Sequence, residues 1–160
     1  MASEHDIGSS DLAHLVARLQ SIDDDDFEHF VGDFFKNADW EFEVTQTHKD
    51  GGVDGIAEKP GFVKQKARVQ AKRYSEGNKV GEPELSRYLK LKEHPDFAQT
   101  DHAVIVTTSS FTRGAFQEGK ALNIKLLDGM GLAVFIKNRG LERLVDEYAP
   151  TEPDEKLSDP

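Results

Sequence analysis

The chain has 160 residues, of which 37% are hydrophobic and 31% charged, and its formal net charge is −10. This length predicts one domain with a hydrophobic core, and the absence of cysteine excludes disulfide bonds and thiolate metal sites. No apolar run approaches the ~20 residues needed to cross a membrane, and the N-terminal sequence lacks the basic and apolar parts of a signal peptide, so we expect a cytoplasmic protein.

The charge is distributed very unevenly along the chain. Residues 1–58 hold 15 acidic and 3 basic side chains, whereas residues 59–73 hold 6 basic and no acidic ones. Residues 74–160 hold 15 acidic and 11 basic side chains. A local basic segment decides where a polyanion binds, while the net charge governs long-range association. The acidic total therefore does not exclude DNA, although it predicts weak non-specific binding.

The first third of the chain predicts two helices. In residues 11–20 the apolar side chains lie on one stripe of a short amphipathic helix. The acidic run from Asp23 to Asp26 is best explained as the solvated start of a second helix, where the helix dipole favours negative charge. That helix carries a core-facing stripe at helical spacing, formed by Phe27, Phe30, Val31, Phe34 and Phe35.

The rest of the chain alternates strands and helices. Strands are predicted at 40–46, 53–58, 62–73, 103–106 and 124–127, and helices at 83–94 and 112–122. Short closing elements follow at 131–137 and 140–148. The order α-β-β-β-α-β-α-β predicts an α/β fold with a central mixed sheet flanked by helices. We expect an N-terminal extension at 1–22, a single domain at 23–149 and a disordered tail at 150–160.

The third strand carries the most informative pattern. Alternate side chains point to opposite faces of a strand, so one face is mostly small and apolar and is suited to packing: Val63, Gln65, Ala67, Val69 and Ala71. The other face is nearly a row of cations: Lys64, Lys66, Arg68, Gln70 and Lys72. A solvated edge strand would explain the first two lysines equally well. For a DNA ligand, the candidate phosphate contacts are Lys64, Lys66, Arg68, Arg73 and Arg113.

The end of this strand and the preceding segment 50–55 together supply the groups needed for phosphodiester hydrolysis. Mg²⁺ prefers oxygen ligands, and Asp54 offers a carboxylate, Gln70 an amide oxygen and Ala71 a backbone carbonyl. Lys72 lies about 6–7 Å from Gln70 along the same face, where it could orient a water and stabilise charge developing on phosphate. The metal would activate that water. Gly51, Gly52 and Gly55 would leave the rim of the site open to a DNA backbone.

These residues resemble the Mrr-type restriction endonucleases, a branch of the PD-(D/E)xK nuclease superfamily. The resemblance covers roughly residues 25–137 and consists of five ordered blocks. The blocks are Phe27-Glu28, Asp50-Gly51-Gly52-Val53-Asp54-Gly55, Gln70-Ala71-Lys72, Val106-Thr107-Thr108-Ser109-Ser110-Phe111-Thr112 and Leu127-Asp128-Gly129.

The resemblance implies a restriction-endonuclease-like core and a catalytic set of Asp54, Gln70 and Lys72. Glu28 would join this set as an auxiliary carboxylate acting through water, with a simple interaction with the helix dipole as the equal alternative. The superfamily usually has Asp or Glu where this chain has Gln70, while Gln is typical of the Mrr branch. Because an amide attracts a cation less strongly than a carboxylate does, we expect low Mg²⁺ affinity.

The sequence therefore predicts a Mg²⁺-dependent DNA endonuclease, in restriction or DNA processing, with Mn²⁺ as a possible substitute. It has no Walker loop or zinc-ligand spacing, so we expect no nucleotide cofactor. Cutting both strands of a duplex needs two active sites, which predicts a homodimer. The alternatives are a non-catalytic DNA-binding module of nuclease fold and a structure-selective nuclease similar to Holliday-junction resolvases.

Overall fold

The computed structural model describes residues 9–45, 54–75, 77–90 and 100–150. Six helices are assigned in these ranges: α1 (Ser9–Gln20), α2 (Asp24–Lys36), α3 (Glu82–Lys90), α4 (Arg113–Leu122), α5 (Gly129–Arg139) and α6 (Glu142–Tyr148). The strands are β1 (Glu41–Val44), β2 (Gly55–Lys59), β3 (Gln65–Lys72), β4 (Lys79–Val80), β5 (His102–Thr107), β6 (Ser110–Phe111) and β7 (Ile124–Leu127). No helix in the described part of the chain is long and apolar enough to span a membrane.

The main sheet has five strands in the order β1-β2-β3-β5-β7. The first three strands are antiparallel neighbours, whereas β3, β5 and β7 run parallel. The strands β4 and β6 form a separate two-stranded parallel sheet. Because β3 and β5 are parallel, their carboxyl ends meet at one edge, where Lys72 pairs with Thr107. The predicted mixed α/β sheet is confirmed.

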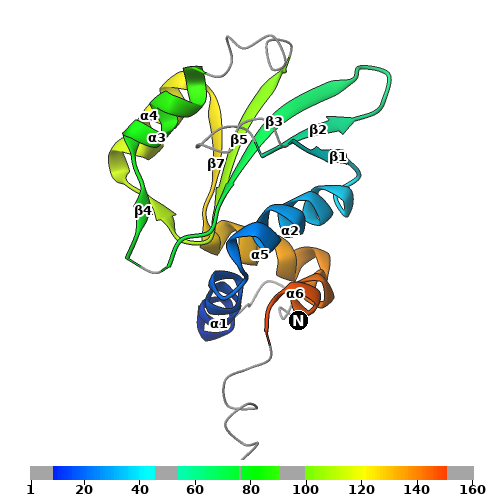
Figure 1. Cartoon of the computed structure of the whole chain (residues 1–160), viewed down its shortest axis with the longest axis vertical. Coiled ribbons are helices and arrows are strands. Elements are labelled where there is room, and N and C mark those ends of the chain that lie inside the picture. The colour runs from blue at the N-terminus through cyan, green and yellow to red at the C-terminus, as the bar shows by residue number, and fades with distance from the viewer. Residues whose placement is uncertain (1–8, 46–53, 76, 91–99, 151–160) are drawn as a thin grey trace, which may run out of the picture.

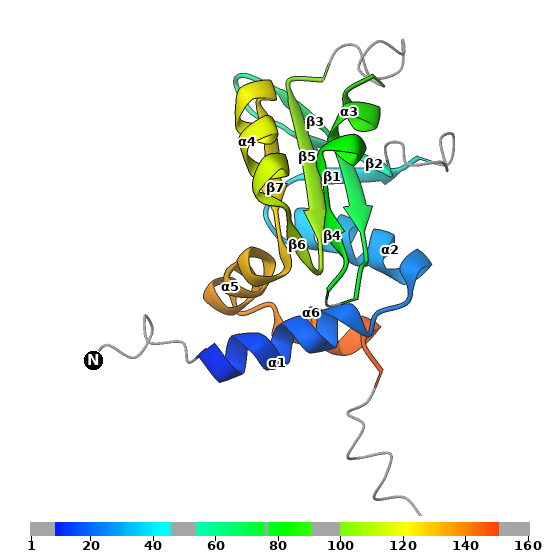
Figure 2. The ribbon, with the colours of Figure 1, turned by 90° about the vertical axis from the view of Figure 1, so that its left-hand side faces the viewer.

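Helices cover both faces of the main sheet and form two hydrophobic clusters (Figure 1). On one face, α3 and α4 pack around Ile105 and Tyr88. On the other face, α2 and α5 pack around Val69 and Val106, and α1 and α6 complete that cluster. Figure 2 shows α1 lying across the end of the molecule beside α5. Since α1 contributes Leu15 and Leu19 to the core, it is packed as part of the same body.

Most predicted elements are present with small shifts at their ends. Residues 124–127 form a strand as predicted, and Thr112 caps α4 by accepting a hydrogen bond from the backbone N–H of Ala115. The third strand is shorter than the predicted 62–73 because residues 61–63 form a bend, and the side chain of Val63 is 70% exposed instead of packed. The short strands β4 and β6 were not predicted. The glycine-rich turn at 48–52 and the tail from 151 lie outside the described residues.

Candidate active site

Three elements bring the predicted catalytic residues to one cavity of about 210 Å³. Asp54 immediately precedes β2, Gln70 and Lys72 lie near the end of β3, and Glu28 comes from the second turn of α2. The eight residues lining this cavity are Asp24, Glu28, Asp54, Gln70, Ala71, Lys72, Arg73 and Tyr74. The structure thus brings together all five residues that the sequence assigned to catalysis and metal binding.

Asp54 is held between the first three strands of the sheet. Its backbone N–H donates to Val69 (2.8 Å), and its backbone carbonyl accepts from Thr45 (2.9 Å). Its carboxylate reaches β3, where Oδ2 accepts a hydrogen bond from the backbone N–H of Ala71 (2.6 Å). The orientation of the carboxylate is therefore fixed by the backbone of the strand that carries Gln70 and Lys72.

The neighbouring glycine has a packing role that the sequence did not reveal. Gly55 is buried, and a Cβ atom built on it would lie 2.1 Å from the ring of Phe42 on β1. A side chain at this position would push β1 away from β2 and disturb the position of Asp54. The prediction that Gly55 opens the rim of the site is therefore wrong, and Gly51 and Gly52 lie outside the described residues.

The carboxyl groups of Asp54 and Glu28 both line the cavity and hydrogen-bond to each other. Burial and, to a lesser degree, the negative charge of Glu28 raise the pKa of Asp54 to about 7, although the Ala71 N–H and the Lys72 ammonium act in the opposite direction. Burial also raises the pKa of Glu28, and its hydrogen bond with Asp54 opposes that increase. Both carboxyl groups therefore hold a proton more tightly than an exposed carboxyl group does.

Lys72 faces this pair from β3 and lies beside an aromatic ring. Its Nζ atom is 5.8 Å from the centroid of the Tyr74 ring, a cation–π contact. The Tyr74 hydroxyl lies 3.4 Å from Glu84 on α3, and burial raises the pKa of Tyr74 above its ordinary value. Lys72 lines the same cavity as the carboxyl pair, and its charge acts to lower the pKa of Asp54.

Arg73 follows β3 directly, lines the same cavity as Lys72, and contacts helices α1 and α2. Its Nε donates to the carboxylate of Asp24 (2.9 Å), and its Nη1 donates to the backbone carbonyl of Gln20 (3.3 Å). Asp24 was interpreted as part of a solvated helix start, and its side chain is indeed 71% exposed. Its contact with Arg73 nevertheless makes it part of the cavity rim, a role that only the pairing of β3 with α2 reveals.

The oxygen atoms around the cavity fit a hard divalent cation. Two carboxyl groups, the Gln70 amide and the backbone of Ala71 line the same space, and oxygen ligands are those that Mg²⁺ prefers. No group of three or more His, Cys, Asp or Glu side chains suited to a metal occurs among the described residues. A bound cation would therefore need the amide, backbone or water oxygens in addition to the carboxylates.

The predicted phosphate contacts have different surroundings. The prediction for Arg68 is wrong, because this side chain is only 2% exposed and is covered by α3. Its guanidinium stacks on the ring of Tyr88 at 5.1 Å, and its Nη1 donates to the hydroxyl of Thr100 (3.0 Å). Lys64 and Lys66 lie 3.6 and 4.0 Å from the carboxylate of Glu58, so they share one acidic partner. Arg113 is exposed at the start of α4.

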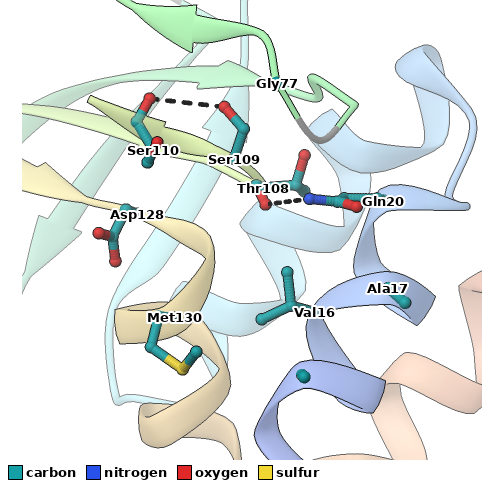
Figure 3. Close-up of a pocket in the computed structure, with 10 residues that line it drawn as sticks. Val16, Ala17, Gln20, Gly77, Thr108, Ser109, Ser110, Asp128 and Met130 are labelled. Atoms are coloured by element: carbon teal, nitrogen blue, oxygen red, sulfur yellow. Dashed lines mark hydrogen bonds between the residues drawn. The ribbon is translucent and has the colours of Figure 1, made fainter. Parts of the chain in front are cut away.

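A second cavity has a volume of about 320 Å³ (Figure 3). It lies between α1, α5 and the β5–β6 turn, and its lining includes Val16, Met130 and Ser109. The wall of this cavity contains Gln20, whose side-chain Nε2 donates to the carbonyl of Thr108 (3.0 Å), while its backbone carbonyl accepts from Arg73, which lines the first cavity. Thr108 in turn bonds the backbone of Tyr74 through its hydroxyl, so this wall fixes the end of β3.

Comparisons with known proteins agree with this geometry. The chain is similar to three solved restriction endonucleases. For AspBHI, described as DNA modification-dependent, the sequence identity is 22% and the TM-score 0.69, with coverage of 88% of this chain and 39% of that one. For MspJI in complex with an oligonucleotide, the sequence identity is 22% and the TM-score 0.57, and the match covers 94% of this chain and 39% of that one. For FokI bound to DNA, the sequence identity is 13% and the TM-score 0.51, and the match covers 88% of this chain and 30% of that one.

At these identities the structures show a common fold, and this chain spans about two fifths of the length of AspBHI and MspJI. No curated protein matches the sequence. The model of the restriction endonuclease family Mrr_cat matches residues 19–136, a range that contains the whole lining of the cavity described above. The chain therefore belongs to this restriction endonuclease family, as its sequence blocks predicted.

Proposed function

We propose that the chain is a metal-dependent DNA endonuclease domain that hydrolyses phosphodiester bonds at the cavity formed by Asp54, Glu28, Gln70 and Lys72. The observation that carries this proposal is that the carboxyl pair and a lysine line one cavity and interact electrostatically. Burial of the Asp54 carboxyl group, which raises its pKa, supports the proposal because a cation entering the cavity would favour the ionised carboxylate.

The residues would hold a Mg²⁺ or Mn²⁺ ion through the Asp54 carboxylate, the Gln70 amide oxygen and the Ala71 carbonyl, with Glu28 reaching it through water. When bound, the ion supplies Lewis-acid polarisation of the phosphate and activation of the attacking water. The Lys72 ammonium orients that water by hydrogen bonding and stabilises the negative charge that develops on the phosphate oxygens. The Ala71 N–H keeps the Asp54 carboxylate oriented throughout.

DNA is the partner that this chemistry requires. Lys64 directly precedes β3 and is 66% exposed, and Lys66 lies near the start of that strand. With Arg113 and the outer part of Arg73, they would contact phosphates on either side of the bond that is cut. Cutting both strands requires two such sites, and we propose that two copies of the chain act as a homodimer.

The test is cleavage of a supercoiled plasmid with Mg²⁺ or Mn²⁺ by the wild type, Asp54→Ala and Lys72→Ala. The matched control is Lys125→Ala, which removes an exposed lysine on β7 outside the cavity. We expect nicking by the wild type and the control, none after addition of EDTA, and at least a hundredfold loss in both cavity variants. Equal nicking by all four proteins, or none with any metal, would exclude the proposed function.

A further inference from the structure

Tyr74 lies two residues after Lys72 and lines the same cavity. The Nζ atom of Lys72 lies over the Tyr74 ring, 5.8 Å from its centroid. Within the described ranges, this ammonium forms no hydrogen bond or salt bridge with another protein group. A lysine side chain is long and flexible and loses much conformational freedom when it is held in one position. Besides the electrostatic interaction with Asp54, the ring is therefore the contact that can restrict where the ammonium lies.

The ring of Tyr74 is itself held by several contacts. The Tyr74 backbone N–H donates to the hydroxyl of Thr108 (2.9 Å), and that hydroxyl donates to the Tyr74 carbonyl (2.7 Å). The Tyr74 hydroxyl lies 3.4 Å from the carboxylate of Glu84 on α3. The ring also packs against the hydrophobic cluster that α3 and α4 cover. Because Thr108 is fully buried, these contacts fix the ring before any ligand binds.

The backbone of Lys72 is held by the same segment that holds Tyr74. The hydroxyl of Thr107 donates to the Lys72 carbonyl (2.8 Å), and the backbone N–H of Thr108 donates to the same carbonyl (3.3 Å). Thr107 and Thr108 are both fully buried at the end of β5. The main chain of Lys72 and the ring of Tyr74 are thus fixed relative to each other, and the lysine side chain is the part that the ring contact must hold.

We infer that Tyr74 is a positioning residue, whose ring holds the Lys72 ammonium in the cavity beside the carboxyl pair. The inference rests on the proposed function, because it takes Lys72 as the group that acts on the phosphate. A cation that is already in place stabilises developing negative charge without a cost of reorganisation. The ring attracts the ammonium through the negative potential of its face. The hydroxyl, which contacts Glu84, has no part in this attraction.

The activity test measures single-turnover nicking of a supercoiled plasmid at a temperature at which circular dichroism shows every variant folded. Tyr74→Leu removes the ring and should lower the maximal rate about tenfold. The DNA concentration that gives half of that rate should stay the same. Tyr74→Phe keeps the ring and loses one long hydrogen bond, so it should retain most of the rate. Phe116→Leu is the matched control, because Phe116 is an aromatic residue on α4 outside the cavity, and it should match the wild type.

A second measurement does not depend on cleavage. In the metal-free protein, NMR relaxation of lysine labelled at Cε gives the order parameter of Lys72, which reports motion on the ps–ns timescale. The Lys72 signal is assigned by its absence in Lys72→Met. In Tyr74→Leu this order parameter should fall to the value of Lys125, an exposed lysine on β7. In Tyr74→Phe and Phe116→Leu it should stay at the wild-type value.

Three results would overturn the inference. Equal losses of rate in Tyr74→Phe and Tyr74→Leu would assign the effect to the hydroxyl. A higher half-maximal DNA concentration at an unchanged maximal rate would make Tyr74 a DNA contact. An unchanged Lys72 order parameter in Tyr74→Leu would show that the ring does not hold the lysine. If the wild type does not nick DNA, the proposed function fails, and the order parameter still decides whether Tyr74 positions Lys72.

Discussion

The substitution Asp54→Asn should stabilise the metal-free protein at alkaline pH. The asparagine side chain would keep an oxygen that can accept the hydrogen bond of the Ala71 N–H, but the substitution would remove one of two crowded carboxyl groups. The pKa of Asp54 is about 7 in the folded chain, against an ordinary value of 3.8. The folded state therefore binds this proton more tightly than the unfolded state does.

The sign of the effect follows from that difference. Below pH 3.8 both states are protonated and Asp54 has no cost, whereas the folded state loses stability as the pH rises from about 4 to about 7. The full difference between the two pKa values corresponds to a loss of about 4 kcal/mol in folding stability. At pH 5, less than about 2 kcal/mol of this loss is present. The Asp54→Asn variant would be free of this penalty at every pH.

The assay is urea unfolding in EDTA at pH 5 and pH 8.5. The unfolding free energy of Asp54→Asn minus that of the wild type should rise by about 2–3 kcal/mol between these values. Asp11→Asn is the matched control, because Asp11 is an exposed residue in the first turn of α1, and it should change stability by less than about 1 kcal/mol. A difference that is independent of pH, or an Asp54→Asn variant less stable than the wild type at pH 8.5, would refute a poorly solvated carboxyl pair.

Three further substitutions test other parts of the account. Tyr88→Phe should lower the free energy of unfolding in urea by about 1–3 kcal/mol. The reason is that the buried hydroxyl donates to the Arg68 carbonyl (2.5 Å) and accepts from the Val104 N–H (3.2 Å). A loss below 0.5 kcal/mol, on the order of measurement error, would contradict this. Arg68→Ala should cost roughly 2–4 kcal/mol and leave the salt dependence of DNA binding unchanged, whereas a lower slope would mean that Arg68 contacts phosphate. Gln70→Glu should tighten Mg²⁺ binding about tenfold or more in calorimetry and destabilise the metal-free protein; unchanged affinity would place Gln70 outside the metal site.

The sequence predicted the order of elements and the members of the cavity because both depend on local patterns. Caps such as Thr112 mark helix starts, and the Gln70-Ala71-Lys72 spacing places two side chains on one face of a strand whatever surrounds it. The alternation of apolar and charged side chains along a strand does not reveal, however, whether a helix covers one of its faces. Arg68 belongs to the cationic face, and only the position of α3 shows that Tyr88 buries it.

The ends of β3 were also beyond local reasoning. Val63 continues the apolar alternation of the strand, but the chain is still turning there and pairing with β2 extends only to Lys59 and Gln65. At the other end, Arg73 contacts Asp24 on α2, 49 residues earlier in the chain. Both differences arise from tertiary contacts that no window of sequence contains.

The most direct test of the central claim separates metal binding from chemistry in the variant Lys72→Met. Lys72 faces the carboxyl pair without being a proposed metal ligand, so the variant should still gain thermal stability from Mg²⁺ as the wild type does. Its single-turnover rate of plasmid nicking, measured over the same Mg²⁺ range, should fall at least a hundredfold. Nicking at the wild-type rate by Lys72→Met would contradict the assignment of this cavity as the catalytic site.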